Sequence, residues 1–301
     1  MTIETFTEPK QVGDFTVYDV TPVPGGNCLL FAAADVCFAY DSGFGFSSDA
    51  LCENVEKVLR GRSLDYILLT HSHYDHAFGS AALRLRCPGC RVIAHSYAAY
   101  VFTREGAKKT MLRLDNTEAE RRGYDTAERY IDHLHVDIPV EDGQELMLGN
   151  HRVRVLCLPG HTRDSIGFLF PESGMLLGCE TAGVIINHRL VMPATLVGFD
   201  TTMASLAVME RLPVRHYFIP HQGMVDEEGY NEYIRMSRHW HETARSLILE
   251  SFRAGKSREE ILDRFRDTFY LEGCSEIYPP AAFRENVNIM IHTVLQEAGY
   301  L

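Results

Sequence analysis

Hydrophobic residues in the first third of the chain occur in short runs separated by turn-forming residues. Residues 15–20, 27–32 and 36–40 alternate with polar positions or are continuously apolar, and a Pro-Val-Pro-Gly-Gly segment separates the first two runs. Two more apolar runs follow at 66–69 and 91–94. Short apolar runs bounded by glycine, proline and aspartate are typical of β-strands. We therefore expect a strand at each of these five positions.

Other segments have apolar residues at helical spacing. Residues 48–59, 78–86 and 201–212 each place apolar side chains three or four positions apart, which predicts helices. A longer amphipathic helix is expected at 230–254. The charge-rich segment 96–133 is also predicted to be helical, as a solvated cover over the strands.

The second half of the chain repeats the strand-rich pattern between residues 140 and 190 and changes character near residue 226. Beyond that point the pattern is helical, and Ser257 with Glu260 has the spacing of a capping box. We divide the chain into a main domain, 1–225, and a helical extension, 226–301. The extension is too short to hold a large core alone, so we expect it to pack against the main domain.

One loop concentrates metal-binding side chains. His71, His73, Asp75 and His76 follow directly after the predicted strand at 66–69, which would deliver all four groups to one point. Neutral imidazole and carboxylate groups are ligands suited to zinc or iron. A solvated polar loop is the alternative, but this spacing of three histidines and an aspartate after a buried strand favours a metal site.

The motif resembles that of the metallo-β-lactamase superfamily, specifically its glyoxalase II-like hydrolase branch. The resemblance implies an α/β fold in which two mixed β-sheets pack face to face with helices outside, an αββα sandwich. Strand and helix alternation alone would also fit a doubly wound sheet. In that family the segment equivalent to 96–133 often frames the substrate opening, and a helical extension covers the metal cleft.

The resemblance requires further ligands downstream, each at the end of a strand. The apolar run 153–158 leads into His161, and the run 216–220 ends at His221. The resemblance therefore implies two divalent metal ions, with zinc expected and with iron or manganese also compatible with the donor atoms. The implied ligands are, for the first ion, His71, His73 and His161, and for the second ion, Asp75, His76 and His221.

The bridging position departs from the family pattern. The family usually has Gly-Asp at the end of the intervening strand, and by register this chain has Cys179 and Glu180 there. We expect Glu180 to lie between the two metals, although its side chain is one methylene longer. A small residue before the carboxylate allows close backbone approach, and Cys179 fills that space. Its thiolate could be a ligand, but a buried small hydrophobe is the favoured interpretation.

Charge and composition restrict the partners. The 301 residues carry a formal net charge of −12, which argues against nucleic acid and against anionic membranes, because both require a basic surface. The first residues lack the basic and apolar regions of a secretory signal, and no apolar run reaches transmembrane length. We expect a cytoplasmic protein with a small-molecule substrate, and nothing in the sequence indicates its oligomeric state.

Eight cysteines occur in the chain, most of them within apolar runs, and we expect these to be buried thiols. Cys87 and Cys90 form a C-x-x-C around Pro88 and Gly89, with no second pair to complete a zinc site. We interpret this segment as a plain turn, with a redox or metal role as the alternative.

The implied reaction is hydrolysis by a metal-bound hydroxide, with Asp75 as a ligand that also passes a proton to the leaving group. The apolar segment 192–199 and the C-terminal helices are the expected substrate lining, with His188 as part of the wall, which suits an ester or thioester. The alternative is a signalling or regulatory protein of the same fold with vestigial activity. A di-iron oxidoreductase is disfavoured, because such relatives usually have glutamate where His73 stands.

Overall fold

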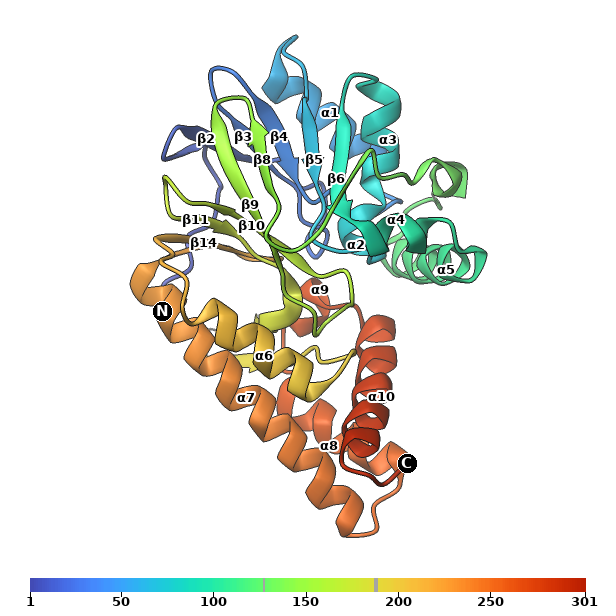
Figure 1. Cartoon of the computed structure of the whole chain (residues 1–301). Coiled ribbons are helices and arrows are strands. Elements are labelled where there is room, and N and C mark those ends of the chain that lie inside the picture. Colours follow the sequence, from blue (N-terminus) through green and yellow to red (C-terminus); the bar gives the residue numbers. More distant parts are fainter. Residues whose placement is uncertain (127, 187–188) are drawn as a thin grey trace.

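Two β-sheets face each other in the computed structural model, which describes residues 1–126, 128–186 and 189–301. Helices lie on the outer side of each sheet (Figure 1), so the predicted αββα sandwich is confirmed. Strands β1 to β4 of the first sheet pair antiparallel, and β4 to β7 pair parallel. In spatial order this sheet contains β1 (Lys10–Val12), β2 (Phe15–Asp19), β3 (Leu29–Ala32), β4 (Cys37–Tyr40), β5 (Tyr66–Leu68), β6 (Arg91–His95) and β7 (Ile138–Val140).

The second sheet is antiparallel except for one parallel pair, β11 with β14. Its spatial order is β15 (Gly223–Asp226), β14 (His216–Ile219), β11 (Met175–Leu177), β10 (Ile166–Phe170), β9 (His151–Cys157) and β8 (Glu145–Leu148). A separate hairpin is formed by β12 (Val184–Ile186) and β13 (Leu190–Met192). The short strands β1 and β15 were not expected, because each follows a polar or glycine-containing segment with little alternation.

Aromatic rings fill the space between the sheets. Phe38 of β4 stacks on Phe31 at 4.9 Å between ring centroids and on Phe170 of the other sheet at 5.7 Å. Phe15 packs edge-on against Phe38, with 5.3 Å between the ring centroids. All four side chains are buried, and burying one such ring contributes roughly 1.5–3 kcal/mol. This core fixes the distance between the sheets and therefore between the strand ends that carry the polar site.

Strand β4 is buried on both faces, because helices cover its outer side. Phe38 and Tyr40 point into the core between the sheets, whereas Cys37 and Ala39 pack under the helices. A strand with both faces covered has a continuous apolar sequence instead of an alternating one. The helices around the first sheet are α1 (Ser48–Leu59), α2 (Tyr74–Ala77), α3 (Gly79–Arg86), α4 (Ser96–Phe102), α5 (Glu105–Arg122) and the 3-10 helix η1 (Glu128–His133).

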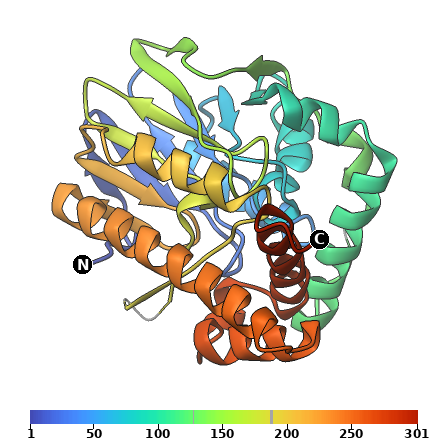
Figure 2. The ribbon, with the colours of Figure 1, turned by 60° about the horizontal axis from the view of Figure 1, so that its bottom comes forward.

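The segment after β15 is helical, as predicted, and lies along one side of the sandwich (Figure 2). Helices α7, α8 and α10 share an apolar core with the β12–β13 hairpin, while α6 and the start of α7 cover the second sheet. The capping box of Ser257 and Glu260 is confirmed at the start of α8. The helices of this half are α6 (Phe199–Met209), α7 (Glu227–Arg253), α8 (Arg258–Phe269), α9 (Cys274–Ile277) and α10 (Pro280–Glu297).

The C-x-x-C segment forms the predicted turn. The Cys87–Cys90 segment is a turn closed by a hydrogen bond from the Cys90 amide to the Cys87 carbonyl at 2.8 Å, and all eight cysteines are free thiols. Within the described residues, the structure contains no helix whose length and hydropathy would suit a membrane span.

One buried histidine on α7 should make folding sensitive to acid. His241 is 1% exposed, and its Nδ1–H donates to the Ser237 carbonyl at 2.8 Å. Burial lowers the pKa of His241 from 6.5 to about 4. As the pH falls below 6.5, His241 therefore gains a proton in the unfolded chain but not in the folded chain. The free energy of unfolding is highest above pH 6.5 and decreases as the pH falls below it.

Between pH 7 and pH 5, we expect the free energy of unfolding to fall by about 2 kcal/mol more in the parent protein than in His241→Leu. This value follows from a loss of about 1.4 kcal/mol for each pH unit below the unfolded pKa. Urea unfolding of both proteins at the two pH values measures this difference. Parallel losses in the two proteins would show that His241 is already protonated in the folded state.

Candidate metal centre

The polar site lies where strand ends of the two sheets meet. The loop after β5 brings His71, His73, Asp75 and His76 from the first sheet, and helix α2 begins within it. The second sheet contributes His161 after β9, Glu180 after β11 and His221 after β14. The structure thus brings together all seven side chains for which the sequence predicted a metal role, and their function as ligands stays a prediction.

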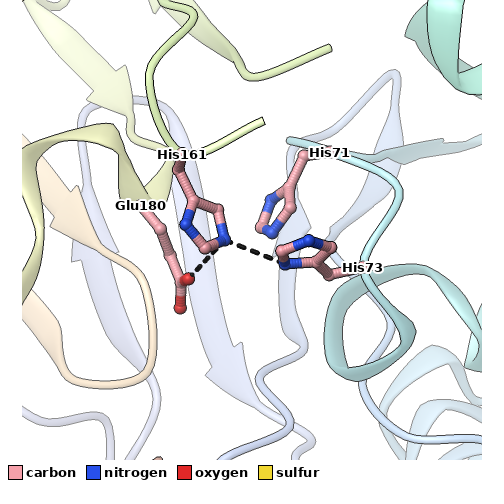
Figure 3. Close-up of side chains that lie close together, drawn as sticks. All are labelled: His71, His73, His161 and Glu180. Atoms are coloured by element: carbon pink, nitrogen blue, oxygen red, sulfur yellow. Dashed lines mark hydrogen bonds and ion pairs between the residues drawn. The ribbon is translucent and has the colours of Figure 1, made fainter. Parts of the chain in front are cut away.

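The first group consists of His71, His73, His161 and Glu180, which point toward one another (Figure 3). One ligating atom from each lies within 4.8 Å of the others. The Nε2 of His161 is 2.9 Å from Nδ1 of His73 and 2.8 Å from Oε2 of Glu180. Three ring nitrogens and a carboxylate oxygen therefore lie close enough to bind one ion, and four is the usual number of ligands in a zinc site.

The second group consists of Asp75, His76, Glu180 and His221, with the same 4.8 Å limit. The Nε2 atoms of His76 and His221 are 3.1 Å apart, and Oδ2 of Asp75 lies 3.9 Å from the first and 4.0 Å from the second. His221 adopts a φ of 65°. This left-handed conformation is uncommon for residues with a Cβ, and it turns the ring toward the site.

Glu180 belongs to both groups because its two oxygens point in different directions. Oε2 faces His161, while Oε1 is hydrogen-bonded to His221 and lies 3.5 Å from Nε2 of His76. Burial opposes ionisation, but His161 and His221 hold the pKa of Glu180 well below its usual range. The longer side chain therefore has the placement of a bridging carboxylate.

The backbone before Glu180 accounts for the departure from Gly-Asp. The backbone packs closely against Tyr217 at Gly178, where a Cβ would collide with the tyrosine ring and hydroxyl. The hydroxyl of Tyr40 donates to the Gly178 carbonyl at 2.5 Å. Cys179 lies in an apolar cluster with its Sγ toward Thr181. Burial raises the pKa of Cys179 to about 11, so the thiol stays neutral, in agreement with the interpretation as a buried hydrophobe.

Asp41, which was not among the predicted site residues, orients the first-sheet ligands. Its Oδ1 accepts from the Thr70 amide at 2.8 Å, and its Oδ2 accepts from the Thr70 hydroxyl at 3.0 Å and from His76 Nδ1 at 2.9 Å. Because the Thr70 hydroxyl donates to Asp41, it accepts from His71 Nδ1–H at 3.0 Å. Both histidines therefore carry a proton on Nδ1 and direct Nε2 toward the site.

The same tautomer is set for His161, whose Nδ1–H donates to the Ala194 carbonyl at 3.1 Å. The Nε2 of His71 is buried without a hydrogen-bond partner among the described residues. A buried lone pair without a donor is unfavourable, and a cation at this point would satisfy it. The donor set and its tautomers therefore fit divalent metal ions.

Electrostatics agree with neutral imidazoles at His71 and His73. Burial, together with the neighbouring histidines, lowers the pKa of His71 and of His73 well below the ordinary value. Burial also acts to lower the pKa of His76, but the carboxylates of Asp41 and Asp75 outweigh it and raise this pKa well above its usual range. A raised pKa means that His76 holds a second ring proton, and a cation in the second group would take its place.

The space beside these side chains is a narrow cavity of about 40 Å³. Residues 192–199 do not line it, contrary to our expectation, because this segment lies behind His161: Ala194 binds its ring, and Leu196 and Val197 donate to the Gly160 carbonyl. His188, the other predicted wall residue, lies outside the described residues. The lining consists of His73, Tyr74, Asp75, Leu114, Glu180, Tyr278, Pro279, Ala282 and Asn286.

Comparison with known proteins gives consistent matches. Residues 21–221 match the metallo-beta-lactamase superfamily. The chain is 29% identical over 181 residues to the metallo-beta-lactamase fold-containing protein ST1585 of Sulfurisphaera tokodaii, covering 57% of this chain and 66% of that protein. It is 25% identical over 149 residues to a hydroxyacylglutathione hydrolase of Brucella anthropi, covering 50% of this chain and 45% of the hydrolase.

The matched region thus spans about two thirds of the archaeal relative and less than half of the bacterial hydrolase. Among solved structures, a metallo-beta-lactamase family protein of Thermus thermophilus superposes with a TM-score of 0.63 at 21% identity, covering 94% of each chain. At this identity the structural likeness concerns the fold, and it includes the helical C-terminal part.

Proposed function

Because this chain belongs to the metallo-β-lactamase superfamily, we propose that it is a metal-dependent hydrolase acting on an ester or thioester of a small molecule. One observation carries the proposal: the two groups of ligating atoms share Glu180, with one carboxylate oxygen facing each group. Pairs of divalent ions held in this way are common in enzymes that activate water. Zinc is the expected ion, given the number of imidazole donors, and iron or manganese also suits them.

The residues that would hold the ions are those of the two groups described above. A divalent cation bound there supplies Lewis-acid polarisation of a substrate oxygen and lowers the pKa of a coordinated water. Asp75 lies both in the second group and in the cavity lining. We propose that its carboxylate carries a proton from the nucleophile to the leaving group. Asp41 and Thr70 keep the ring orientations fixed throughout.

The cavity lining supports a substrate with an apolar part. Leu114, Pro279 and Ala282 form one wall beside Asp75 and Glu180. The similarity to hydroxyacylglutathione hydrolases supports a thioester, although only part of those proteins is matched. The net charge of −12 disfavours a nucleic-acid substrate.

The size of the cavity favours a second candidate function. About 40 Å³ is far below the several hundred Å³ that ligand pockets usually provide. A regulatory or signalling protein that keeps the fold and the metals but turns substrate over weakly would fit such a restricted site. The assay below separates the two candidates.

We expect protein purified without added metal to contain two ions per chain by elemental analysis. A panel of thioesters, lactones and phosphodiesters should reveal metal-dependent hydrolysis that a chelator removes and that added zinc, manganese or iron restores. Less than one ion per chain, even after incubation with these salts, would refute the metal site. Full metal content with no turnover of any substrate would favour the regulatory candidate.

A further inference from the structure

The C-terminal helices close one side of the cavity next to the candidate ligands. Tyr278 and Pro279, which follow α9, and Ala282 and Asn286 of α10 line it together with Asp75 and Glu180. No other part of the described chain after residue 226 lines this cavity. The extension therefore contributes polar groups to the site as well as covering it.

Two arginines of α5 fix the segment that precedes Tyr278. Arg121 donates to the Ser275 carbonyl at 3.3 Å, and Arg122 donates to the Glu276 carbonyl at 3.2 Å. Both guanidinium groups also pair with Glu118, whose side chain is buried. These contacts join α5 to α9 and hold the tyrosine at the edge of the cavity.

Two hydrogen bonds then set the position of Tyr278. Its carbonyl accepts from the Tyr270 hydroxyl at 2.8 Å, and its own hydroxyl oxygen accepts from the Asn286 amide nitrogen. The side chain is buried, and the nearby carboxylates of Glu180 and Asp75 add to the effect of burial in raising the pKa of Tyr278. The phenol is therefore protonated.

The Tyr278 hydroxyl has one proton to donate. The hydroxyl oxygen already accepts a hydrogen bond from Asn286. Within the described part of the chain, the hydroxyl proton has no acceptor. A donor kept free at the wall of a cavity, beside carboxylates that would hold cations, is suited to an oxygen atom of a bound molecule.

We propose that Tyr278 is a substrate-contacting residue that donates a hydrogen bond to the oxygen that becomes negatively charged when an ester or thioester carbonyl is attacked. Asn286 is a positioning residue that holds the hydroxyl in this orientation. The inference rests on the proposed function for the identity of the bound oxygen. A preorganised donor to a developing oxyanion typically contributes about 100- to 1000-fold in kcat.

Tyr278→Phe tests the inference because the ring is retained and only the hydroxyl is removed. We expect kcat/KM for the best thioester or ester of the panel to fall about 100-fold with unchanged metal content. Tyr230→Phe is the matched control: Tyr230 is also buried, its hydroxyl donates to the Met209 carbonyl at 2.7 Å, and it does not line the cavity. The control should keep activity within about twofold, as expected for a hydroxyl outside the site.

A second comparison identifies the role of Asn286. Asn286→Leu should lower kcat in the parent but have no further effect on kcat in the Tyr278→Phe background, because it acts through that hydroxyl. Additive losses would indicate a general packing role for Asn286 and would overturn its part of the inference.

Binding of butylphosphonate to the metal-loaded protein, measured by calorimetry, separates this inference from the proposed function. This anion mimics the tetrahedral species without requiring turnover. Tyr278→Phe should weaken its binding about tenfold or more while Tyr230→Phe does not, as expected for one lost hydrogen bond to a charged group. If the parent binds the phosphonate through Tyr278 but hydrolyses no substrate, the hydrolase proposal is rejected and the Tyr278 contact is supported. Equal binding and equal kcat/KM in parent and Tyr278→Phe, or a parent that binds no phosphonate, would overturn the contact.

Discussion

His71→Ala should abolish hydrolysis and remove the metal ion of the first group. The Nε2 of His71 is the one ring nitrogen of that group that is buried without any partner among the described residues, and Thr70 fixes its tautomer. Without it, the first group keeps only two imidazoles and one shared carboxylate oxygen. We expect a loss well above the roughly 10- to 100-fold that follows removal of an outer hydrogen-bond partner of a ligand. Steady-state kinetics and elemental analysis of the same preparation measure both effects.

Cys87→Ser provides the control for this substitution. Cys87 lies in a surface turn, is partly buried and has a free thiol, so its replacement should leave activity and metal content nearly unchanged. Activity in His71→Ala equal to that of the parent would reject the metal-dependent mechanism. Loss of activity in Cys87→Ser, with the fold intact, would instead show that the turn has a chemical role.

Substitutions of Glu180 should separate the two metal positions. Glu180→Gln removes the negative charge that offsets two dications and can direct an amide N–H₂ toward a ligating nitrogen. We therefore expect the loss of one ion and a fall in activity of about 100-fold or more, comparable with the loss of a strong electrostatic contact. Glu180→Asp keeps the charge but shortens the side chain. Because Oε1 and Oε2 now face different groups, the shorter carboxylate should reach only one of them.

Metal titration of the parent, Glu180→Asp and Glu180→Gln measures this directly. The expected order of second-ion affinity is parent, then Asp, then Gln. Tighter binding by the Asp variant would mean that the glutamate is displaced from the bridge. Identical titrations of all three proteins would remove Glu180 from the set of ligands.

The part of the site that lies close together in sequence could be predicted, because a strand end delivers neighbouring residues to one place. His71, His73, Asp75 and His76 needed no knowledge of the tertiary structure. His161 and His221 required the resemblance, since nothing local says that their strands end at the same point. Asp41 directly follows β4, which pairs parallel with β5, with Tyr40 opposite Leu68. That pairing could not be read from the sequence, so nothing in the local pattern indicated that this carboxylate lies beside the histidines.

The cavity wall was harder to predict for a related reason. Hydrophobicity predicts that a segment is buried but not what it packs against. Residues 192–199 were assigned to the lining on composition, yet their backbone supports His161 from behind. Tyr278 and Asn286 reach the site through the packing of α5 against α9 and α10, more than 150 residues apart in some contacts. Helical patterning indicates the apolar side of each helix, and it does not specify the neighbouring helix.

The two sheets each supply an incomplete half of the candidate metal centre, and this division has a consequence for how long the protein survives. An ion bound there would cross-link the two halves of the sandwich, so its binding free energy would add to the free energy of unfolding. At a free metal concentration one thousand times the Kd, this linkage is worth about 4 kcal/mol, a large share of the stability of an ordinary domain. A cell poor in the metal would thus lose the protein to proteolysis of the opened chain, and its abundance would follow metal supply as well as gene expression.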